Sequence, residues 1–315
     1  MKELKILVAE TKDFSPETKV YLEDQFDVTL KDLSNQEVAE ALNEYDVFWF
    51  RLKFNLTREV LTRSERCRYI VCPVTGLDHI DLTVCAEKGI NVISLKGETD
   101  FLKEVRATAE HTIGLTLALL RSLPAAVNSV KKGIWNRDLF KGREIFGKKV
   151  GIVGVGRLGT ITASFFKTFG ADVSGFDVKP FASEICKPTN SLEELFGQND
   201  IISIHVNLTE STKHLVTFRE LQLMKTGSFL INTSRGNIVK GGDLIRALNE
   251  KIVMGAAVDV VESEYDIEQD ELVKFAQHND NLLITPHIGG NTWESFEKTE
   301  FFLAKKLVSF IQDNR

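Results

Sequence analysis

The chain has 315 residues and a formal net charge of −6, from 39 Lys and Arg against 45 Asp and Glu. This length is enough for two domains, and an acidic chain without a basic block is not typical of a nucleic-acid-binding protein. No apolar stretch approaches the roughly 20 residues of a membrane span, and the N-terminal apolar run is too short for a signal peptide. The four cysteines lack metal-ligand spacing. We therefore expect a cytoplasmic protein that binds no metal, no membrane and no nucleic acid.

Two series of short apolar runs, separated by helix-like segments, follow one another along the chain. Their alternation predicts an α/β fold with two doubly wound parallel sheets, each covered by helices on both faces. A helical stretch is expected at 103–121, between the two series, and another at 293–311. The first series lies at 4–9, 26–30, 47–50, 69–72 and 91–93, and the second at 150–153, 173–176, 201–204, 229–231, 253–258 and 282–284.

The segment 131–147 reads KKGIWNRDLFKGREIFG and has too many large side chains for a flexible linker. Its aromatic residues Trp135, Phe140 and Phe146 are expected to be buried. Either their own domain or a partner subunit would cover them.

Residues 149–160 read KVGIVGVGRLGT and hold the most informative motif in the chain. Gly154, Gly156 and Gly159 have GxGxxG spacing between a strand-like run and a helix-like run. Such glycines permit a tight turn, close approach of backbone to a pyrophosphate, and close packing of helix on strand. The N–H groups at the helix start favour the phosphate charge. The motif predicts a dinucleotide site; the alternative is a Gly-rich turn in an ordinary βαβ unit.

An acid follows this motif at the end of the next apolar run. Asp177 lies 18 residues after Gly159. A carboxylate there can accept protons from both ribose hydroxyls, and its charge would repel a 2′-phosphate. We therefore expect NAD rather than NADP as the cofactor, although Lys179 lies close by and weakens that repulsion.

Hydride transfer between NAD and a hydroxy acid requires a cation for the carboxylate, a group that exchanges a proton with the hydroxyl, and a partner for that group. Arg235 in INTSRGN and His287 in ITPHIGGNT each follow a strand, where the loops of open sheets meet a cofactor. The guanidinium fork suits a carboxylate, and histidine exchanges protons near neutral pH. The ordinary alternatives are a surface-turn arginine and a capping or buried histidine.

Two acids complete this group. Glu264 follows AAVDVVES, and a carboxylate beside His287 would stabilise the protonated imidazole. The alternative is that Glu264 is one more charge in the acidic run 262–271. Asp259 ends the preceding strand and is expected to fix either the nicotinamide amide or the active-site network.

Six motifs resemble those of the D-isomer-specific 2-hydroxyacid dehydrogenases, in the family's order and spacing and over essentially the full chain. Three positions depart from the family pattern: Asn207 and Tyr265 each replace a proline, and Val261 replaces an aromatic residue. We expect these changes to alter the shape of the pocket without touching the catalytic residues. The motifs are Gly76-Leu-Asp-His-Ile-Asp81, Ala109-Glu-His111, the three glycines, Asn232-Thr-Ser-Arg-Gly236, Asp259 with Glu264, and Pro286-His-Ile-Gly289.

The resemblance implies a role for each of these residues. Arg235 would bind the carboxylate and carbonyl of the keto acid. His287 would donate the proton in reduction and accept it in oxidation, and Glu264 would hydrogen-bond His287. Backbone N–H groups of Thr75 and Gly76 would hold the substrate carboxylate from the other domain. The implied cofactor contacts are Gly154, Gly156, Arg157, Leu158, Gly159, Asp177, Asn207, Thr212, Thr233, Asp259 and Gly289.

The resemblance also implies the domain organisation. A Rossmann-like NAD-binding domain, 102–284, would be inserted in a discontinuous substrate domain, 1–101 and 285–315. The region 103–147 would correspond to the family's dimer-forming arm, so the expected protein partner is a second copy of the chain.

The choice of substrate is expected to lie in the segment FRLKFN of the first domain. Arg51 is common in the family and discriminates little. Lys53, two residues further along an extended segment, points the same way and could bind a phosphate or second carboxylate, as in 3-phosphoglycerate dehydrogenase. If Lys53 is instead a solvated surface lysine, a glyoxylate/hydroxypyruvate reductase is expected. The alternative from another class is a non-catalytic, NAD(H)-sensing interaction protein.

Overall fold

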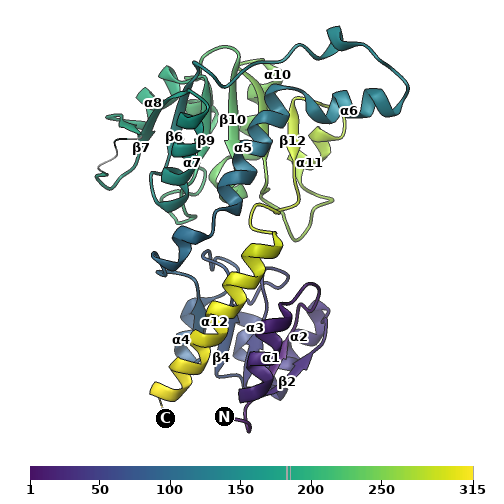
Figure 1. Cartoon of the computed structure of the whole chain (residues 1–315), viewed down its shortest axis with the longest axis vertical. Coiled ribbons are helices and arrows are strands. Elements are labelled where there is room, and N and C mark those ends of the chain that lie inside the picture. Colours follow the sequence, from purple (N-terminus) through teal and green to yellow (C-terminus); the bar gives the residue numbers. More distant parts are fainter. Residues whose placement is uncertain (182–183, 185, 315) are drawn as a thin grey trace. The chain divides into compact units, whose positions relative to one another are not determined.

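The computed structural model describes residues 1–181, 184 and 186–314. The chain forms two compact units (Figure 1). The first unit comprises Met1–Val105 and Asn291–Arg315, and the second comprises Arg106–Gly290. Each unit is built around its own parallel sheet.

A five-stranded sheet in the order β2-β1-β3-β4-β5 forms the centre of the first unit. Its strands are β1 (Lys5–Val8), β2 (Asp27–Leu30), β3 (Val47–Trp49), β4 (Tyr69–Cys72) and β5 (Asn91–Ser94). The helices are α1 (Pro16–Gln25), α2 (Val38–Glu44), α3 (Arg58–Thr62), α4 (Leu82–Glu87) and α12 (Trp293–Asp313), with short 3₁₀ turns η1 (Asn35–Glu37) and η2 (Phe101–Glu104).

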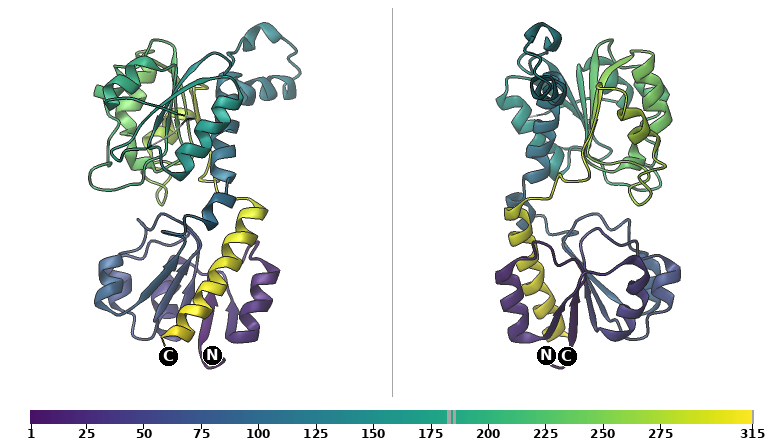
Figure 2. Two further views of the ribbon diagram at one scale, coloured as in Figure 1. Left: turned by 60° about the vertical axis from the view of Figure 1, so that its left-hand side comes forward. Right: turned by 90° about the vertical axis from the view of Figure 1, so that its right-hand side faces the viewer.

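Alternating side chains along the strands divide the core of the first unit into two layers. In β1, Ile6 and Val8 pack in the cluster that includes α1 and α12, whereas Leu7 packs in the cluster that includes α2, α3 and α4. Successive strand residues face opposite sides of a sheet, so an unbroken apolar run fills both layers. Helices accordingly lie on both faces of this sheet (Figure 2).

The last helix, α12, supplies much of one layer. Its residues Leu303, Ala304, Leu307, Val308 and Ile311 are buried at helical spacing against the sheet and α1. Thr292 caps the helix by accepting a hydrogen bond from the backbone N–H of Ser295. The sequence predicted this helix over 293–311.

A seven-stranded parallel sheet in the order β12-β11-β10-β9-β6-β7-β8 forms the centre of the second unit. Its strands are β6 (Lys149–Val153), β7 (Asp172–Phe176), β8 (Lys187–Pro188), β9 (Ile201–Ile204), β10 (Ser228–Asn232), β11 (Val253–Val258) and β12 (Leu282–Ile284). The helices are α5 (Ala107–Leu120), α6 (Leu123–Lys131), α7 (Arg157–Thr168), α8 (Leu192–Gln198), α9 (Phe218–Leu221), α10 (Gly241–Asn249) and α11 (Glu271–Ala276), with 3₁₀ turns η3 (Arg137–Phe140) and η4 (Gly236–Ile238).

The strand order of the second unit reverses beside β6. The chain proceeds from β6 to β7 and β8 on one side, then returns to β9 and proceeds to β12 on the other. In open α/β sheets, ligands bind at the carboxyl edge of such a switch point. Helices α5 and α7 cover one face of the sheet, and α8 to α11 cover the other. The predicted fold class, two doubly wound parallel sheets with a Rossmann-like second unit, is confirmed. The two-residue strand β8 and the helix α6 were not predicted from the sequence.

The segment from α6 to Phe146 leaves apolar side chains uncovered. Figure 1 shows α6 and the loop after it extending from the rest of the second unit. Trp135 is 89% exposed and Phe146 75%, whereas Phe140 is partly buried. The single chain therefore does not bury Trp135 or Phe146.

Among the described residues, no single helix is long and apolar enough to cross a membrane. One pair, Phe101–Leu120 with Leu123–Lys131, reaches that length and composition only when its two parts, bent by 62°, are taken together.

Candidate active site

The glycine motif forms the turn between β6 and α7, at the switch point of the second sheet. Gly154 has φ +88°, a conformation that favours glycine. A β-carbon at Gly159 would lie 2.0 Å from the carbonyl oxygen of Gly154, so only glycine lets the helix start so close to the strand. At Gly156, by contrast, a β-carbon would meet no atom within 4 Å. The space over the helix start is therefore open to a ligand.

Asp177 lies at the end of β7, beside this turn. Its Oδ2 accepts a hydrogen bond from the N–H of Val155 at 2.9 Å, and its Oδ1 accepts one from the N–H of Lys179 at 2.9 Å. These bonds fix the carboxylate next to the glycine turn and leave further lone pairs on both oxygens. The sequence-predicted cradle of three glycines and an acid is thus assembled in one place.

The loop after β9 lies at the same edge of the sheet, because β9 is parallel to β6 and next to it. Thr212 closes it, because its hydroxyl donates to the carbonyl of Asn207 at 2.6 Å and accepts from the N–H of Thr209 at 2.8 Å. His205, at the start of the loop, donates its backbone N–H to Val153. The Thr212 hydroxyl thus closes the turn that begins at Asn207, one of the positions expected to depart from the family pattern.

Asp259 holds the loop that carries His287. Its carboxylate is 1% exposed and accepts hydrogen bonds from the N–H groups of Ile288 and Gly289 and from the Thr285 hydroxyl. His111 Nε2 lies 3.2 Å from the same carboxylate. Burial alone would raise the pKa of Asp259, but these hydrogen bonds outweigh it and hold the pKa below its ordinary value.

The sequence predicts no role for His111, although it lies in one of the six motifs. Its Nε2 contacts both Asp259 and the Thr285 hydroxyl, at 3.2 and 3.0 Å. The helix α5 therefore contributes to the support of the 285–289 loop. Thr233, after β10, is bonded to α5 in a similar way, through Thr112 at 2.8 Å.

His287 and Glu264 meet at the carboxyl ends of β12 and β11. The distance from His287 Nδ1 to Glu264 Oε2 is 2.8 Å, and the two side chains are 24% and 31% exposed. His287 has φ +53°, an uncommon conformation for a residue other than glycine, and its N–H donates to the Asp259 carbonyl. The backbone is thus held so that the imidazole faces Glu264.

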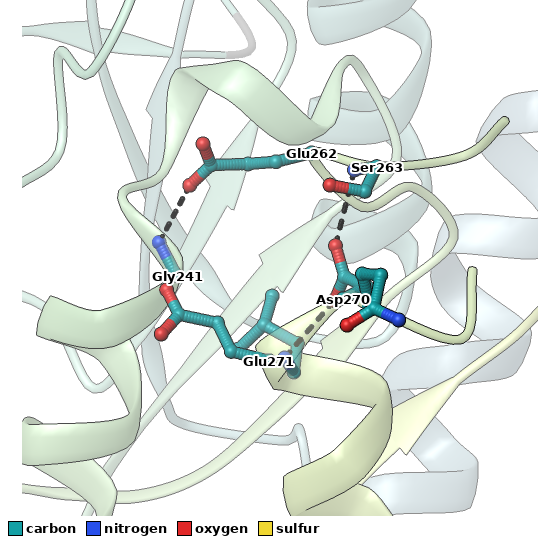
Figure 3. Close-up of a pocket in the computed structure, with 7 residues that line it drawn as sticks. Gly241, Glu262, Ser263, Asp270 and Glu271 are labelled. Atoms are coloured by element: carbon teal, nitrogen blue, oxygen red, sulfur yellow. Dashed lines mark hydrogen bonds between the residues drawn. The ribbon is translucent and has the colours of Figure 1, made fainter. Parts of the chain in front are cut away.

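Other carboxylates of the acidic run 262–271 have structural partners. Glu262 Oε1 accepts from the N–H of Gly241 at 2.8 Å, and Asp270 Oδ2 accepts from the N–H of Ser263 at 3.1 Å. Asp270 also caps α11. Figure 3 shows these bonds around a hollow at the start of α10, with the carboxylate of Glu271 beside Gly241. These acids shape the loop after β11, and Glu264 is the member of the run that contacts His287.

Arg235 follows β10, the strand beside β11. Its Nη1 donates to the Ser234 carbonyl at 2.8 Å, and its own carbonyl accepts from the Asn232 amide at 2.9 Å. A β-carbon at Gly236 would lie 2.0 Å from the backbone of Val261, so the Arg235 loop packs directly on the loop after β11. Adjacent strands β10, β11 and β12 therefore carry Arg235, Glu264 and His287 at the same edge of the sheet.

The candidate substrate residues other than Arg235 lie in the first unit. The N–H groups of Thr75 and Gly76, after β4, donate to no other described residue. Arg51, after β3, is already engaged: Nε and Nη2 bond Glu300, Nη1 bonds the Lys12 carbonyl, and its side chain is 12% exposed. Lys53 is exposed, and its backbone N–H donates to Glu10 at 2.6 Å.

The cysteines and the other side chains that could bind a metal ion were compared with the ordinary requirements for reactive thiols and metal sites. All four cysteines are buried, and they are not in disulfides. Burial raises the pKa of Cys67 to about 12 and the pKa of Cys85 and of Cys186 to about 11, which disfavours the reactive thiolate. Across the described ranges, no three His, Cys, Asp or Glu side chains are grouped so as to hold a metal ion.

A glycine cradle at a switch point, with an acid beside it and a His–Glu pair at the same sheet edge, defines a nicotinamide-dependent oxidoreductase. The family model described as "D-isomer specific 2-hydroxyacid dehydrogenase, NAD binding domain" matches residues 113–289. The D-3-phosphoglycerate dehydrogenase of Haemophilus influenzae is 32% identical over 89% of this chain and 67% of its own length. The hydroxypyruvate reductase of Thermotoga maritima is 31% identical over 90% of each chain.

A solved structure agrees with this likeness. The D-lactate dehydrogenase of Aquifex aeolicus, complexed with NAD and lactic acid, superimposes with a TM-score of 0.83 at 28% identity, covering 98% of this chain and 96% of that one. The chain belongs to the D-isomer-specific 2-hydroxyacid dehydrogenase family. It is an NAD-dependent oxidoreductase that acts on CH–OH donors, transferring a hydride between nicotinamide and a small D-2-hydroxy or 2-keto acid.

Proposed function

We propose that Arg235, Glu264 and His287 carry out the reaction in this chain. The 2.8 Å contact between His287 Nδ1 and Glu264 Oε2 supports this most directly. Because the carboxylate accepts the Nδ1 proton, the proton exchanged with substrate resides on Nε2. In reduction, Nε2 donates this proton to the carbonyl oxygen; in oxidation, it takes the proton from the hydroxyl. Glu264 stabilises the positive charge that the imidazole carries.

The cofactor residues proposed from the sequence suit NAD. Bound NAD supplies or accepts the hydride. The open space over Gly156 and the start of α7 suits the pyrophosphate, since N–H groups and the helix dipole favour anions there. The carboxylate of Asp177, fixed by two backbone N–H groups, suits the ribose hydroxyls. Arg157, Leu158, Asn207, Thr212, Thr233, Asp259 and Gly289 complete the proposed cofactor site.

We propose that Arg235 of the second unit and the N–H groups of Thr75 and Gly76 of the first unit each bind the substrate carboxylate. Those N–H groups donate to no other described residue, as expected of donors that serve a ligand. In this proposal the first unit, Met1–Val105 and Asn291–Arg315, is the substrate domain, and the second unit, Arg106–Gly290, is the NAD-binding domain. The bounds expected from the sequence, 1–101 with 285–315 and 102–284, differ from these units by a few residues, and the units place His287 in the second.

We further propose that the substrate is a small keto acid without a second anionic group, as in the glyoxylate/hydroxypyruvate reductases. The engagement of Arg51 by Glu300 supports this choice, because a guanidinium already paired with a buried carboxylate does not offer its fork to a phosphate. Lys53 is the remaining cation of the segment, and Glu10 lies against its backbone. A phosphorylated substrate would depend on Lys53 alone.

A histidine variant tests the assignment of the proton donor. We expect His287→Ala to lower turnover by roughly 10²–10⁴-fold while leaving NADH binding largely intact. His278→Ala, an exposed histidine of the same unit, is the matched control and is expected to behave as the wild type. Near-wild-type turnover in His287→Ala would refute the role of His287.

A substrate panel tests the proposed specificity. Oxidation of NADH would be followed with glyoxylate, hydroxypyruvate, pyruvate, 2-ketoglutarate and 3-phosphohydroxypyruvate. We expect turnover of the three acids with one anionic group, and no more than slow turnover of 2-ketoglutarate and 3-phosphohydroxypyruvate, which carry a second anionic group. Selective turnover of 3-phosphohydroxypyruvate, lost in Lys53→Gln, would instead establish Lys53 as an anion-binding residue.

The exposed apolar side chains of the segment 122–146 support a homodimer. Trp135 and Phe146 are too apolar to stay in water without cost, and a second copy of the chain is the partner we propose for them. Light scattering would then give twice the mass of one chain, and Trp135→Glu would shift it toward one chain. We propose a cytoplasmic location, which the four cysteines outside disulfides support.

A further inference from the structure

The loop 285–289 carries the proposed proton donor, and several of its hydrogen bonds end on Asp259. The Asp259 carboxylate accepts from the Thr285 hydroxyl at 2.6 Å and from the N–H groups of the last two loop residues at 2.9 and 2.7 Å. The backbone N–H of His287 donates to the Asp259 carbonyl at 2.8 Å. The position of Asp259 therefore sets the position of the loop and of the His287 imidazole.

Helix α5 supplies the one side chain that bonds this carboxylate from outside β11 and the loop, among the residues that the structure describes. His111 Nε2 lies 3.2 Å from Asp259 Oδ1 and 3.0 Å from Thr285 Oγ1. The Thr285 hydroxyl gives its proton to Asp259, and an ionised carboxylate only accepts hydrogen bonds. Because both atoms that face Nε2 are acceptors, His111 carries a proton on Nε2 and donates it.

The loop also packs tightly on the first turn of α5. A β-carbon at Gly289 would lie 2.9 Å from Asp259 Oδ2 and 3.2 Å from Thr108 Cγ2. Thr108 and His111 are three residues apart in α5 and so lie on the same face of the helix. This face of α5 therefore contacts the loop and also bonds the carboxylate that holds it.

His287 depends on such support because of its backbone conformation. Its φ of +53° is uncommon for a residue other than glycine and persists only where surrounding contacts hold it. Its Nδ1 lies 2.8 Å from Glu264 Oε2, a contact that a small displacement of the loop would break. A misplacement of about 1 Å at a reacting group can lower the rate about 100-fold.

We propose that His111 is a positioning residue for the reaction. Through Asp259 and Thr285, it holds the loop in the conformation that directs His287 toward Glu264. This inference rests on the proposed role of His287 as proton donor, and His111 itself touches no reacting atom. Since His111 acts through the N–H donor at Nε2, glutamine should replace it in part, because its side-chain amide offers a donor at similar reach. Leucine should not.

Steady-state kinetics of the full chain, with NADH and the keto acid reduced fastest in the substrate panel, give the first test. His111→Leu should lower kcat by about 10–100-fold, with little change in the dissociation constant of NADH, and His111→Gln should recover most of the kcat. The matched control is Thr116→Val, which removes a buried hydroxyl whose 2.7 Å bond to the Thr112 carbonyl is internal to α5. It should keep the wild-type kcat even where the thermal midpoint falls.

A nuclear magnetic resonance experiment on the chain without cofactor gives a readout that needs no turnover. The imidazole ¹⁵N shifts report which ring nitrogen carries the proton, and His287→Ala identifies the signals of His287. At about pH 9, where an ordinary histidine is neutral, the wild type should hold this proton on Nδ1, which faces Glu264. His111→Leu should move the signals toward those of free histidine, and His111→Gln should leave them near the wild type.

Three results would overturn the proposal. They are an unchanged kcat or unchanged His287 signals in His111→Leu, an equal loss of kcat in Thr116→Val, and a His111→Gln variant no better than His111→Leu. Near-wild-type turnover in His287→Ala would instead refute the proposed function. The His287 signals would then decide, without reference to catalysis, whether His111 holds the loop.

Discussion

Removal of the Glu300 side chain is expected to destabilise the first unit strongly. Its carboxylate is 0% exposed, bonds Arg51 through both Nε and Nη2, and accepts the N–H of Ser15 at 2.8 Å. Burial raises the pKa of Glu300 despite the attraction of Arg51. The ionised pair is therefore no large net source of stability. The loss of stability in Glu300→Ala arises because Arg51 and the N–H of Ser15 stay buried without the carboxylate.

The size of this loss in unfolding free energy follows from the buried charge that remains. Breaking a buried ion pair by removing one member costs about 3–5 kcal/mol, because the other charge stays buried and unpaired. In Glu300→Ala that charge is Arg51, which is 12% exposed. The double variant Arg51→Met with Glu300→Leu removes both charges and should recover most of the loss.

Equilibrium urea unfolding, followed by tryptophan fluorescence, measures this loss. Trp49 is 1% exposed in the first unit, whereas Trp135 and Trp293 are already 89% and 66% exposed. The fluorescence change on unfolding therefore reports mainly on the core around Trp49. A loss below about 1 kcal/mol in Glu300→Ala, or a double variant less stable than the single one, would refute this account.

Three further predictions concern the second unit. Burial lowers the pKa of His205 to about 4, so between pH 6.5 and pH 4 the unfolded chain binds a proton that the folded chain does not bind. The free energy of unfolding should therefore decrease as the pH is lowered through this range, by about 2 kcal/mol at pH 5. In urea titrations, His205→Gln should lose less stability at acid pH than the wild type. Gly159→Ala should lower the thermal midpoint, because its β-carbon would meet the Gly154 carbonyl at 2.0 Å, whereas Gly156→Ala should keep the midpoint and weaken NADH binding measured by fluorescence. Asp177→Ala should reduce the preference for NAD over NADP; an unchanged ratio of kcat/KM values would contradict the ribose role.

The sequence predicts the fold well where a pattern is local and periodic. The strand-like runs at βα spacing and the helix near 293–311 follow from hydrophobic periodicity, and the glycine turn follows from a motif with one backbone solution. The pairing of His287 with Glu264 could also be predicted, since both follow neighbouring strands of one sheet.

Contacts between distant segments could not be predicted in this way. Nothing near Arg51 in the sequence indicates that its guanidinium forms an ion pair with Glu300, 249 residues away. His111 is a further case, because its motif was visible but its partners Asp259 and Thr285 lie on other elements.

The discontinuous first unit has a consequence for synthesis of the chain. Its core joins β1 residues Ile6 and Val8 to Leu303 and Leu307 of α12, so about 300 residues separate the two sides of one packed layer. At about 5–20 residues per second, a ribosome needs roughly 15–60 s between them. The second unit, whose strands end at Ile284, can fold first. During that interval the apolar face awaiting α12 stays exposed, and we expect nascent chains to rely on chaperones at that stage.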